Sequence, residues 1–468
     1  MLMYGKTLAT EKQIAVKNPY TGEIIDYVSH ATREDVVIAG EMAEQGWLKT
    51  RKLSRFQRST ILLKAASIVK DRRIDFAKLI VTEAGKTITQ AYKEVDRCIN
   101  TLTLSAEEAK RHNGETLPFD SYEGSENRQG YFTKEPLGII VAITPFNDPL
   151  NLVAHKIGPA MACGNSILLK PSELAPLSAI KLCKVMLEAG YPQDALGVLT
   201  GDAETGSSLV SLPKVRMVSF TGGVTTGEAI IKTAGLKKYA MDLGGNAPVI
   251  VLADCDMALA VEACVSGSFW AAGQNCIGSQ RLLIEKGIYD DFKDEFIKQT
   301  KEMVVGDPMN EATDMGPMIS EATAIRAQSW ANEAIAEGAN LLYGNERDKS
   351  LYAPTVLDNV TLNSKVLCNE VFAPIVNLVP VENMNEAIEI ANRPEYSLHA
   401  GIFTKDLERA LSAADQIEAS GIMINDSSDY RFDAMPFGGY KYGGLGREGV
   451  RFSMDEMSQT KVICFNRD

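Results

Sequence analysis

Three side chains in this sequence could perform covalent chemistry on a carbonyl group. Cys276 lies in FWAAGQNCIGSQR, where glycines and amides predict a tight turn rich in backbone N–H groups. Such a turn can lower the pKa of a thiol and make it nucleophilic, although many lone cysteines are simply small buried hydrophobic residues. Asn147, after the buried strand of ITPFNDPL, could donate a hydrogen bond to an oxyanion, and Asp242 in MDLGGN could be a general base. Both also fit ordinary turn residues, so each interpretation stays open.

Two strand ends could bind a dinucleotide. VRMVSF runs into Thr221-Gly222-Gly223 and a helical segment, in which Thr225 and Glu228 have capping-box spacing. Glycines at a helix N-terminus let a phosphate approach free N–H groups. The pattern is not GxGxxG, however, and an ordinary strand-to-helix turn would look the same.

The second strand end is that of SILLK. It finishes at Lys170, where open α/β sheets bind ligands, and Ser172 and Glu173 follow. The Glu173 carboxylate could accept hydrogen bonds from ribose hydroxyls and would repel a 2′-phosphate by about 1–4 kcal/mol at contact distance. This favours NAD over NADP, with a solvated surface pair as the alternative.

The elements that must position these residues alternate between helices and strands. The segment 33–109 has helical apolar spacing. A first series then contains the strands IIVAIT, SILLK, LGVLT, VRMVSF and APVIVLA, and a second runs from LLIEKG to GIMIND. This predicts an α/β fold with two parallel-sheet lobes covered by helices. Residues 116–134 and the terminal QTKVICFN fit neither lobe, so we expect them to pair with another subunit.

Composition narrows the class of protein. The 468 residues carry a net charge of −13 without a block of like charges, which argues against nucleic-acid binding. The longest apolar stretches are too short to span a bilayer, and we expect no secretory signal. The eight cysteines are scattered and only four histidines occur, so we expect neither disulfides nor a metal site, and a cytoplasmic location.

Taken together, these motifs resemble the aldehyde dehydrogenase superfamily. PFN, KPSE, FTGG, DLGGN, GQNC, EVFAP and PFGGYK occur in the family's order and at its usual spacing, and the similarity extends from NPYTGEII to QTKVI. The resemblance implies a Rossmann-like NAD(P)-binding lobe of residues 1–115 and 136–243 and a catalytic lobe of residues 244–445. It also implies a bridging β-hairpin of residues 116–135 and 446–468 for a homodimer or homotetramer.

The resemblance also implies individual site residues. Cys276 matches the thiolate nucleophile, Asn147 the side-chain half of the oxyanion hole, and Glu448 a carboxylate sometimes assigned to proton relay. The positions that match or adjoin the family's cofactor contacts are Thr144, Pro145, Phe146, Lys170, Ser172, Glu173, Phe220, Thr221, Gly222, Gly223, Leu243, Glu370 and Phe372. The implied reaction oxidises an aldehyde to a carboxylic acid with NAD, or with NADP, through a thioester on Cys276.

One position departs from the family pattern. Asp242 stands where the family usually has glutamate, and its side chain is shorter by one methylene, roughly 1.5 Å. Either Asp242 acts through an additional water, or Glu448 is the base, or the acyl group passes to coenzyme A as in the acylating branch. The first two are favoured because a carboxylate is retained. A third class, a non-catalytic cofactor-binding protein of the same fold, would lack turnover altogether.

The substrate is expected to be small and polar or anionic. INDSSDYRFDAMPFGG and TPFNDPLNLVAHK resemble lactaldehyde dehydrogenase-like members, whose relatives include enzymes for sulfo- and phospho-aldehydes. Arg97, His155 and Arg431 are candidates to meet an anionic group, although Arg97 fits an ion pair with Glu94 equally well. Asn275 stands where phosphate- and phosphonate-using relatives often carry arginine. This weakens those substrates and leaves a hydroxyaldehyde or a sulfonated aldehyde.

Overall fold

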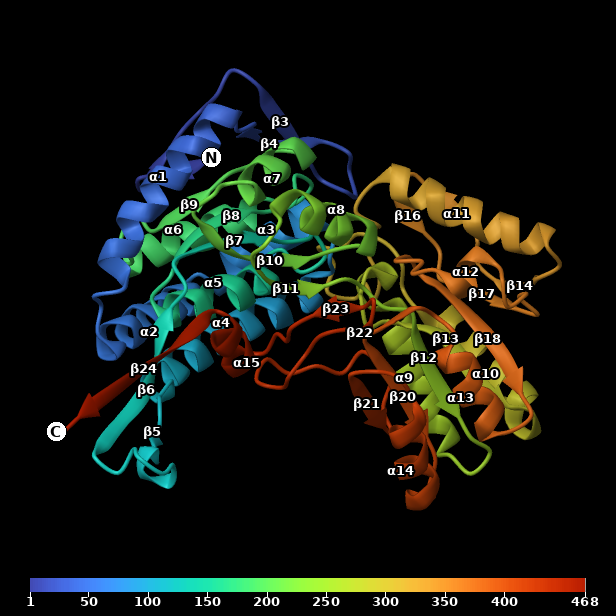
Figure 1. The fold of residues 1–468 in the computed structure, drawn as a ribbon. Helices are drawn as coiled ribbons and strands as arrows, with labels where there is room; N and C mark the ends of the chain where they lie inside the picture. The colour runs from blue at the N-terminus through green and yellow to red at the C-terminus, as the bar shows by residue number, and fades with distance from the viewer. Residues whose placement is uncertain (468) are drawn as a thin grey trace.

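The computed structural model describes residues 1–467, which form two α/β lobes and a projecting third sheet (Figure 1). The first lobe contains an eight-stranded sheet in the order β2-β1-β9-β8-β7-β10-β11-β23. Its parallel centre consists of β7 (Ile139–Ile143), β8 (Ser166–Lys170), β9 (Leu196–Val198), β10 (Val215–Thr221) and β11 (Lys238–Asp242). The antiparallel strands at its edges are β1 (Leu2–Met3), β2 (Lys6–Thr7) and β23 (Gly444–Leu445).

Helices cover both faces of this first sheet. They are α1 (Arg33–Thr50), α2 (Arg55–Asp71), α3 (Arg73–Ala84), α4 (Ile88–Arg111), α5 (Asn151–Cys163), α6 (Leu177–Ala189), α7 (Ala203–Val210), α8 (Val224–Ala234) and α15 (Val450–Glu456). Alternate residues of β7 therefore enter different cores, with Ile140 in one and Val141 in the other. Every residue of α5 is buried, because it packs between the sheet and α4. The predicted helical segment 33–109 is confirmed as α1 to α4.

The second lobe repeats the arrangement with a seven-stranded sheet in the order β14-β17-β18-β13-β12-β20-β21. The strands are β12 (Ala247–Val251), β13 (Ser279–Glu285), β14 (Asn340–Tyr343), β17 (Thr355–Asp358), β18 (Ile375–Val381), β20 (His399–Phe403) and β21 (Gly421–Ile424). The helices are α9 (Met257–Phe269), α10 (Tyr289–Glu302), α11 (Glu321–Ala336), α12 (Lys365–Cys368), α13 (Met384–Asn392) and α14 (Leu407–Gln416). All pairs in this sheet are parallel except β14 with β17, which confirms the predicted parallel-sheet lobe.

The third sheet projects from the first lobe (Figure 1). It contains β5 (Thr116–Leu117), β6 (Arg128–Pro136) and β24 (Ser458–Asn466), and β24 pairs with β6 along its whole length. The two segments that fitted neither lobe thus pair with each other. The remaining short strands are β3 (Gln13–Lys17), β4 (Ile24–Ser29), β15 (Arg347–Asp348), β16 (Leu351–Tyr352), β19 (Tyr396–Ser397) and β22 (Tyr440–Lys441).

Two local features differ from the sequence pattern. The predicted Thr225–Glu228 capping box is wrong, because α8 begins at Val224 after Gly223 and no side chain caps it. After the second lobe, the chain also returns to the first through β23 and α15 before it enters β24. None of the helices in residues 1–467 is long and apolar enough to cross a membrane.

Candidate active site

Cys276 lies in a tight loop between α9 and β13. The loop follows a 3₁₀ turn at Trp270–Gly273, in which Ala271, Ala272 and Gly273 have φ angles of 50°, 55° and 66°. The left-handed conformation costs a non-glycine residue about 1–2 kcal/mol, so it persists only where surrounding structure fixes the backbone. The direction in which the thiol points is therefore set before any ligand binds.

Two cavities meet at Cys276. The larger has a volume of about 480 Å³ and the smaller about 200 Å³, and Asn147, Leu152 and Cys276 line both. Asn147 follows β7 at the carboxyl end of the first sheet, whereas Cys276 comes from the second lobe. The thiol and the amide predicted to act on one carbonyl group are thus brought to the same place by different lobes.

Asp242 has a buried carboxylate in the wall of the smaller cavity. Neither of its oxygens has a hydrogen-bond partner among the described residues. Burial, followed by the charge of Glu448, raises the pKa of Asp242 to about 7, against the opposing charges of Arg431 and Lys156. Burial, followed by the charge of Asp242, raises the pKa of Cys276 well above its ordinary value. The thiol therefore needs a base, and a carboxylate with a pKa near 7 suits that task.

Glu448 is already bound to two cations. Its Oε1 accepts a hydrogen bond from Lys156 Nζ at 2.8 Å, and its Oε2 accepts one from Arg431 at 3.1 Å. Although burial acts to raise its pKa, these cations hold the pKa of Glu448 far below its usual range. A carboxylate with so little affinity for a proton is a weak base. The geometry therefore favours Asp242 over Glu448 for activation of water.

The smaller cavity contains many of the expected cofactor contacts, namely Pro145, Phe146, Thr221, Gly222, Gly223, Glu370 and Phe372. A Cβ atom added at Gly223 would have no heavy atom within 4 Å, so space is open at the N-terminus of α8. The first N–H groups of α8 have no side-chain cap and can bind a phosphate. These residues fit a dinucleotide.

Glu370 and Phe372 reach the smaller cavity from the second lobe. Glu370 Oε1 accepts a hydrogen bond from Gly245 N at 3.2 Å, and burial raises the pKa of Glu370 to about 8. Phe372 has a φ angle of 49°, and its ring packs edge-on against Phe146 with centroids 5.8 Å apart. A positive φ angle at a bulky residue persists only where the surrounding structure fixes the backbone.

The other expected cofactor residues lie outside the residues that line the smaller cavity. Lys170 Nζ is 3.4 Å from Glu173 Oε2, and the Ser172 hydroxyl accepts a hydrogen bond from the backbone N–H of Leu174. Three more are buried beside the central strands, namely Thr144, Phe220 and Leu243. Their contact with a cofactor stays a prediction.

Three of the four expected substrate residues line the larger cavity, namely Arg97, Asn275 and Arg431. The fourth, His155, is fully buried, and its Nε2 lies 3.0 Å from Asp433 Oδ1. The expected contact of His155 with substrate is therefore not supported, because its side chain lies behind the cavity wall. Asn275 Oδ1 accepts a hydrogen bond from Ile277 N at 3.3 Å, which braces the loop around the thiol.

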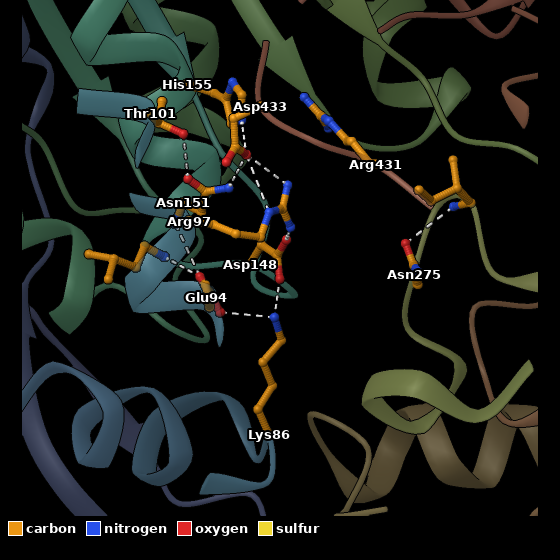
Figure 2. Close-up of polar contacts among 12 residues, drawn as sticks. Lys86, Glu94, Arg97, Thr101, Asp148, Asn151, His155, Asn275, Arg431 and Asp433 are labelled. Carbon is orange, nitrogen blue, oxygen red and sulfur yellow. Dashed lines mark hydrogen bonds and ion pairs between the residues drawn. The ribbon is translucent and has the colours of Figure 1, made fainter. Parts of the chain in front are cut away.

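Arg97 is held by two aspartates that sequence reasoning missed (Figure 2). Its guanidinium group lies 3.1 Å from Asp433 and 3.4 Å from Asp148. Lys86 in turn contacts Asp148 and donates to Glu94 at 2.8 Å. Arg97 thus forms ion pairs as expected, but not with Glu94, which pairs with Lys86 instead. The sequence pointed to Asp148 in one way only, because it directly follows Asn147, the residue predicted to stabilise the oxyanion.

Two parallel-sheet lobes, an uncapped glycine turn at the N-terminus of α8 and a thiol where two cavities meet are the arrangement of one class, the nicotinamide-dependent dehydrogenases. The family model described as "Aldehyde dehydrogenase family" matches residues 7–463, so the chain belongs to that family. It is an NAD(P)-dependent aldehyde dehydrogenase, which confirms the expected family and class of enzyme.

The sequence similarity to known proteins extends over almost the whole chain. Aspartate-semialdehyde dehydrogenase 1 of Pseudomonas canavaninivorans is 58% identical over 456 residues, which are 97% of each chain. A lactaldehyde dehydrogenase of Methanococcus aeolicus is 42% identical over 460 residues, again 97% of each chain. The solved structure of glyceraldehyde-3-phosphate dehydrogenase GapN from Methanocaldococcus jannaschii, complexed with NADP, has a TM-score of 0.94 and 42% identity over 98% of this chain and 100% of that one. These similarities confirm the lactaldehyde dehydrogenase-like branch and the fold.

Proposed function

We propose that this enzyme oxidises a small anionic aldehyde to the carboxylic acid through a thioester on Cys276. The observation that carries the proposal is the position of Cys276, whose thiol meets both a cavity with open glycine turns and a cavity lined by Arg97 and Arg431. The relatives named for aspartate semialdehyde, lactaldehyde and glyceraldehyde 3-phosphate support a short polar substrate. A cavity of about 480 Å³ suits molecules of that size.

In the first stage, Asp242 takes the thiol proton through an intervening water, and the thiolate of Cys276 attacks the carbonyl carbon. The Asn147 amide and the Cys276 backbone N–H donate hydrogen bonds to the resulting oxyanion. When bound, the nicotinamide cofactor supplies the hydride acceptor, and the acyl group stays on Cys276 as a thioester. Asp242 then releases the thiol proton to solvent and deprotonates a water that attacks the thioester. It returns this second proton to the departing Cys276 sulfur, so that the acid leaves and the thiol is restored.

Hydrolysis, rather than transfer of the acyl group to coenzyme A, is supported by the state of Asp242. Both of its carboxylate oxygens are free of hydrogen bonds from the described residues, and the pKa is raised to about 7. A carboxylate in this state can deprotonate a water beside the thioester. The ion pair of Lys170 with Glu173 keeps a carboxylate near the expected ribose site, which supports NAD as the preferred cofactor.

The same proposal includes a homodimer or homotetramer in the cytoplasm. All eight cysteines are free thiols, as a reducing compartment requires. Val462 and Phe465 on β24 are 56% and 53% exposed, so this strand presents apolar side chains that a second copy could cover.

Replacement of the nucleophile tests the proposed function. Cys276→Ser should lower aldehyde-dependent reduction of NAD or NADP by at least about 10³-fold, since the covalent route is lost. Cys464→Ser is the matched control, because Cys464 is exposed on β24 and should leave turnover unchanged. Absorbance at the reduced-cofactor band gives the rates. Undiminished oxidation by folded Cys276→Ser would rule out the thioester route.

A further inference from the structure

The larger cavity carries negative as well as positive side chains. Lys93, Arg97 and Arg431 line it together with Asp426 and Asp429. A site for a phosphate or sulfonate alone would be weakened by two aspartates, because each repels a further negative charge. The mixture instead matches a ligand that carries charges of both signs.

Arg431 has a donor that the protein leaves unused. One terminal nitrogen of Arg431 donates to Glu448 at 3.1 Å, and the side chain is only 7% exposed. Its buried Nε has no hydrogen-bond partner among the described residues. Because Arg431 also lines the larger cavity, a ligand there can accept hydrogen bonds from the remaining terminal N–H groups of its guanidinium. Arg97, by contrast, is already shared between Asp148 and Asp433, so Arg431 is the better placed of the two for a substrate carboxylate.

The loop that carries Asp426 and Asp429 is hydrogen-bonded to the loop that carries the nucleophile. Both follow β21, and Ser428 between them donates its hydroxyl hydrogen to Ile277 O at 2.8 Å, one residue after Cys276. Burial raises the pKa of Asp429, and the charge of Asp426 adds to that increase. Two neighbouring carboxylates that repel each other are stabilised when a cation lies between or beside them.

We propose that the larger cavity binds an amino-acid semialdehyde, with its ammonium group at Asp426 and Asp429 and its carboxylate at Arg431. This inference rests on the proposed function, because the aldehyde carbon must reach the same Cys276 thiol. It assigns specificity to the loop after β21, in which the two aspartates discriminate between an aldehyde that carries an amino group and one that lacks it.

A pair of aldehydes that differ only in the amino group tests the assignment. The wild-type kcat/KM for 2-amino-4-oxobutanoate should exceed that for 4-oxobutanoate by at least about tenfold, the effect of one charge-assisted hydrogen bond. Asp429→Asn and Asp426→Asn keep side-chain volume and should lower this ratio about tenfold, through a higher KM for the amino aldehyde only. Asp415→Asn, at an exposed position on α14, is the control and should keep the wild-type ratio. Equal kcat/KM values in the wild type, or a ratio that neither variant changes, would overturn the assignment.

A second measurement needs neither a variant nor turnover. L-aspartate and succinate also differ by one amino group, and either can occupy the cavity that contains Cys276. L-aspartate should slow alkylation of the Cys276 peptide by iodoacetamide at a concentration about tenfold below that needed for succinate, as mass spectrometry would record. Equal protection by both acids would overturn the ammonium site. If neither aldehyde reduces NAD or NADP while L-aspartate protects selectively, the proposed oxidation fails and the ammonium site stands.

Discussion

Asp242 and Cys276 lie close enough that a negative charge on the carboxylate raises the pKa of the thiol. The charged carboxylate disfavours the thiolate, yet the same carboxylate is the base that the thiol and the hydrolytic water need. A single proton shared between the two groups resolves this conflict, because each stage of the reaction needs only one of them charged.

Asp242→Asn should separate the two stages. Hydride transfer should become slower, because the thiol loses its base, although removal of the Asp242 charge also lowers the thiol pKa. A burst of reduced cofactor should remain, because steady-state turnover should fall further, by about 10²–10⁴-fold, when water loses its base. Since the pKa of Asp242 is about 7, wild-type turnover should rise with pH through that value, and the variant should lack this rise. Stopped-flow absorbance measures both phases. Asp242→Glu, which keeps a carboxylate, is the control, and loss of the burst in folded Asp242→Asn would contradict the role.

Sequence reasoning located the reacting atoms but not the residues that hold them. Cys276, Asn147 and Asp242 stand out because each lies at a predicted turn within a recognisable motif. Asp433 has no such context, and it contacts Arg97 across 336 positions of sequence. No local period or spacing encodes that contact, so only the packed fold reveals that His155 and Arg97 share one aspartate.

At the scale of elements, the orientation of the thiol depends on the turn after α9. A Cβ atom added at Gly273 would lie 2.1 Å from the Ala373 carbonyl oxygen, in the segment that leads into β18. The backbone of Gly273 therefore packs directly against the segment between Phe372, which lines the smaller cavity, and β18. Through this packing the turn before Cys276 connects the walls of the two cavities.

Gly273→Ala should therefore reduce activity more than it reduces stability. The clash and the positive φ angle of 66° would shift the loop, and a displacement of about 1 Å can cost about 100-fold in rate. Gly287→Ala is the matched control, since no heavy atom lies within 4 Å of the added Cβ. Aldehyde oxidation and thermal unfolding of both variants would be compared, and wild-type kcat in Gly273→Ala would refute the link.

Only one helix boundary of the first segment was predicted, its start at residue 33, which matches the start of α1. Capping boxes of Thr32 with Asp35 and of Thr87 with Gln90 begin α1 and α4. The start of α8 was misplaced because the extended backbone of Gly223 begins it without any side chain. The two-residue β23 was also invisible, because so short a strand has no period.

At the scale of the whole molecule, β24 is an exposed strand that offers both backbone and apolar side chains. It pairs with β6 on one side only, as the end strand of its sheet. An uncovered edge of this kind tends to pair with another chain. If the protein forms the proposed homo-oligomer, we expect this strand to lie in the interface.

Val462→Asp should dissociate the oligomer, because it places a charge where an apolar side chain would be buried at a cost of about 1.5–3 kcal/mol per subunit. Leu411→Asp adds the same charge at a side chain that is also 56% exposed but lies on α14 of the second lobe, and it should leave the assembly intact. Sedimentation velocity gives the masses. An unchanged mass for Val462→Asp would place the interface elsewhere.

The return of the chain to the first lobe has a consequence for biogenesis. Lys156 lies in the fully buried α5, and its counter-ion Glu448 emerges from the ribosome only after the second lobe has been synthesised. Until then a nascent first lobe contains a buried ammonium group that has the Ser219 hydroxyl but no counter-ion, and a sheet without β23, both of which oppose closure. We therefore expect the first lobe to reach its full stability only after residues 444–456 have been synthesised, although domains generally begin to fold in the order of their synthesis.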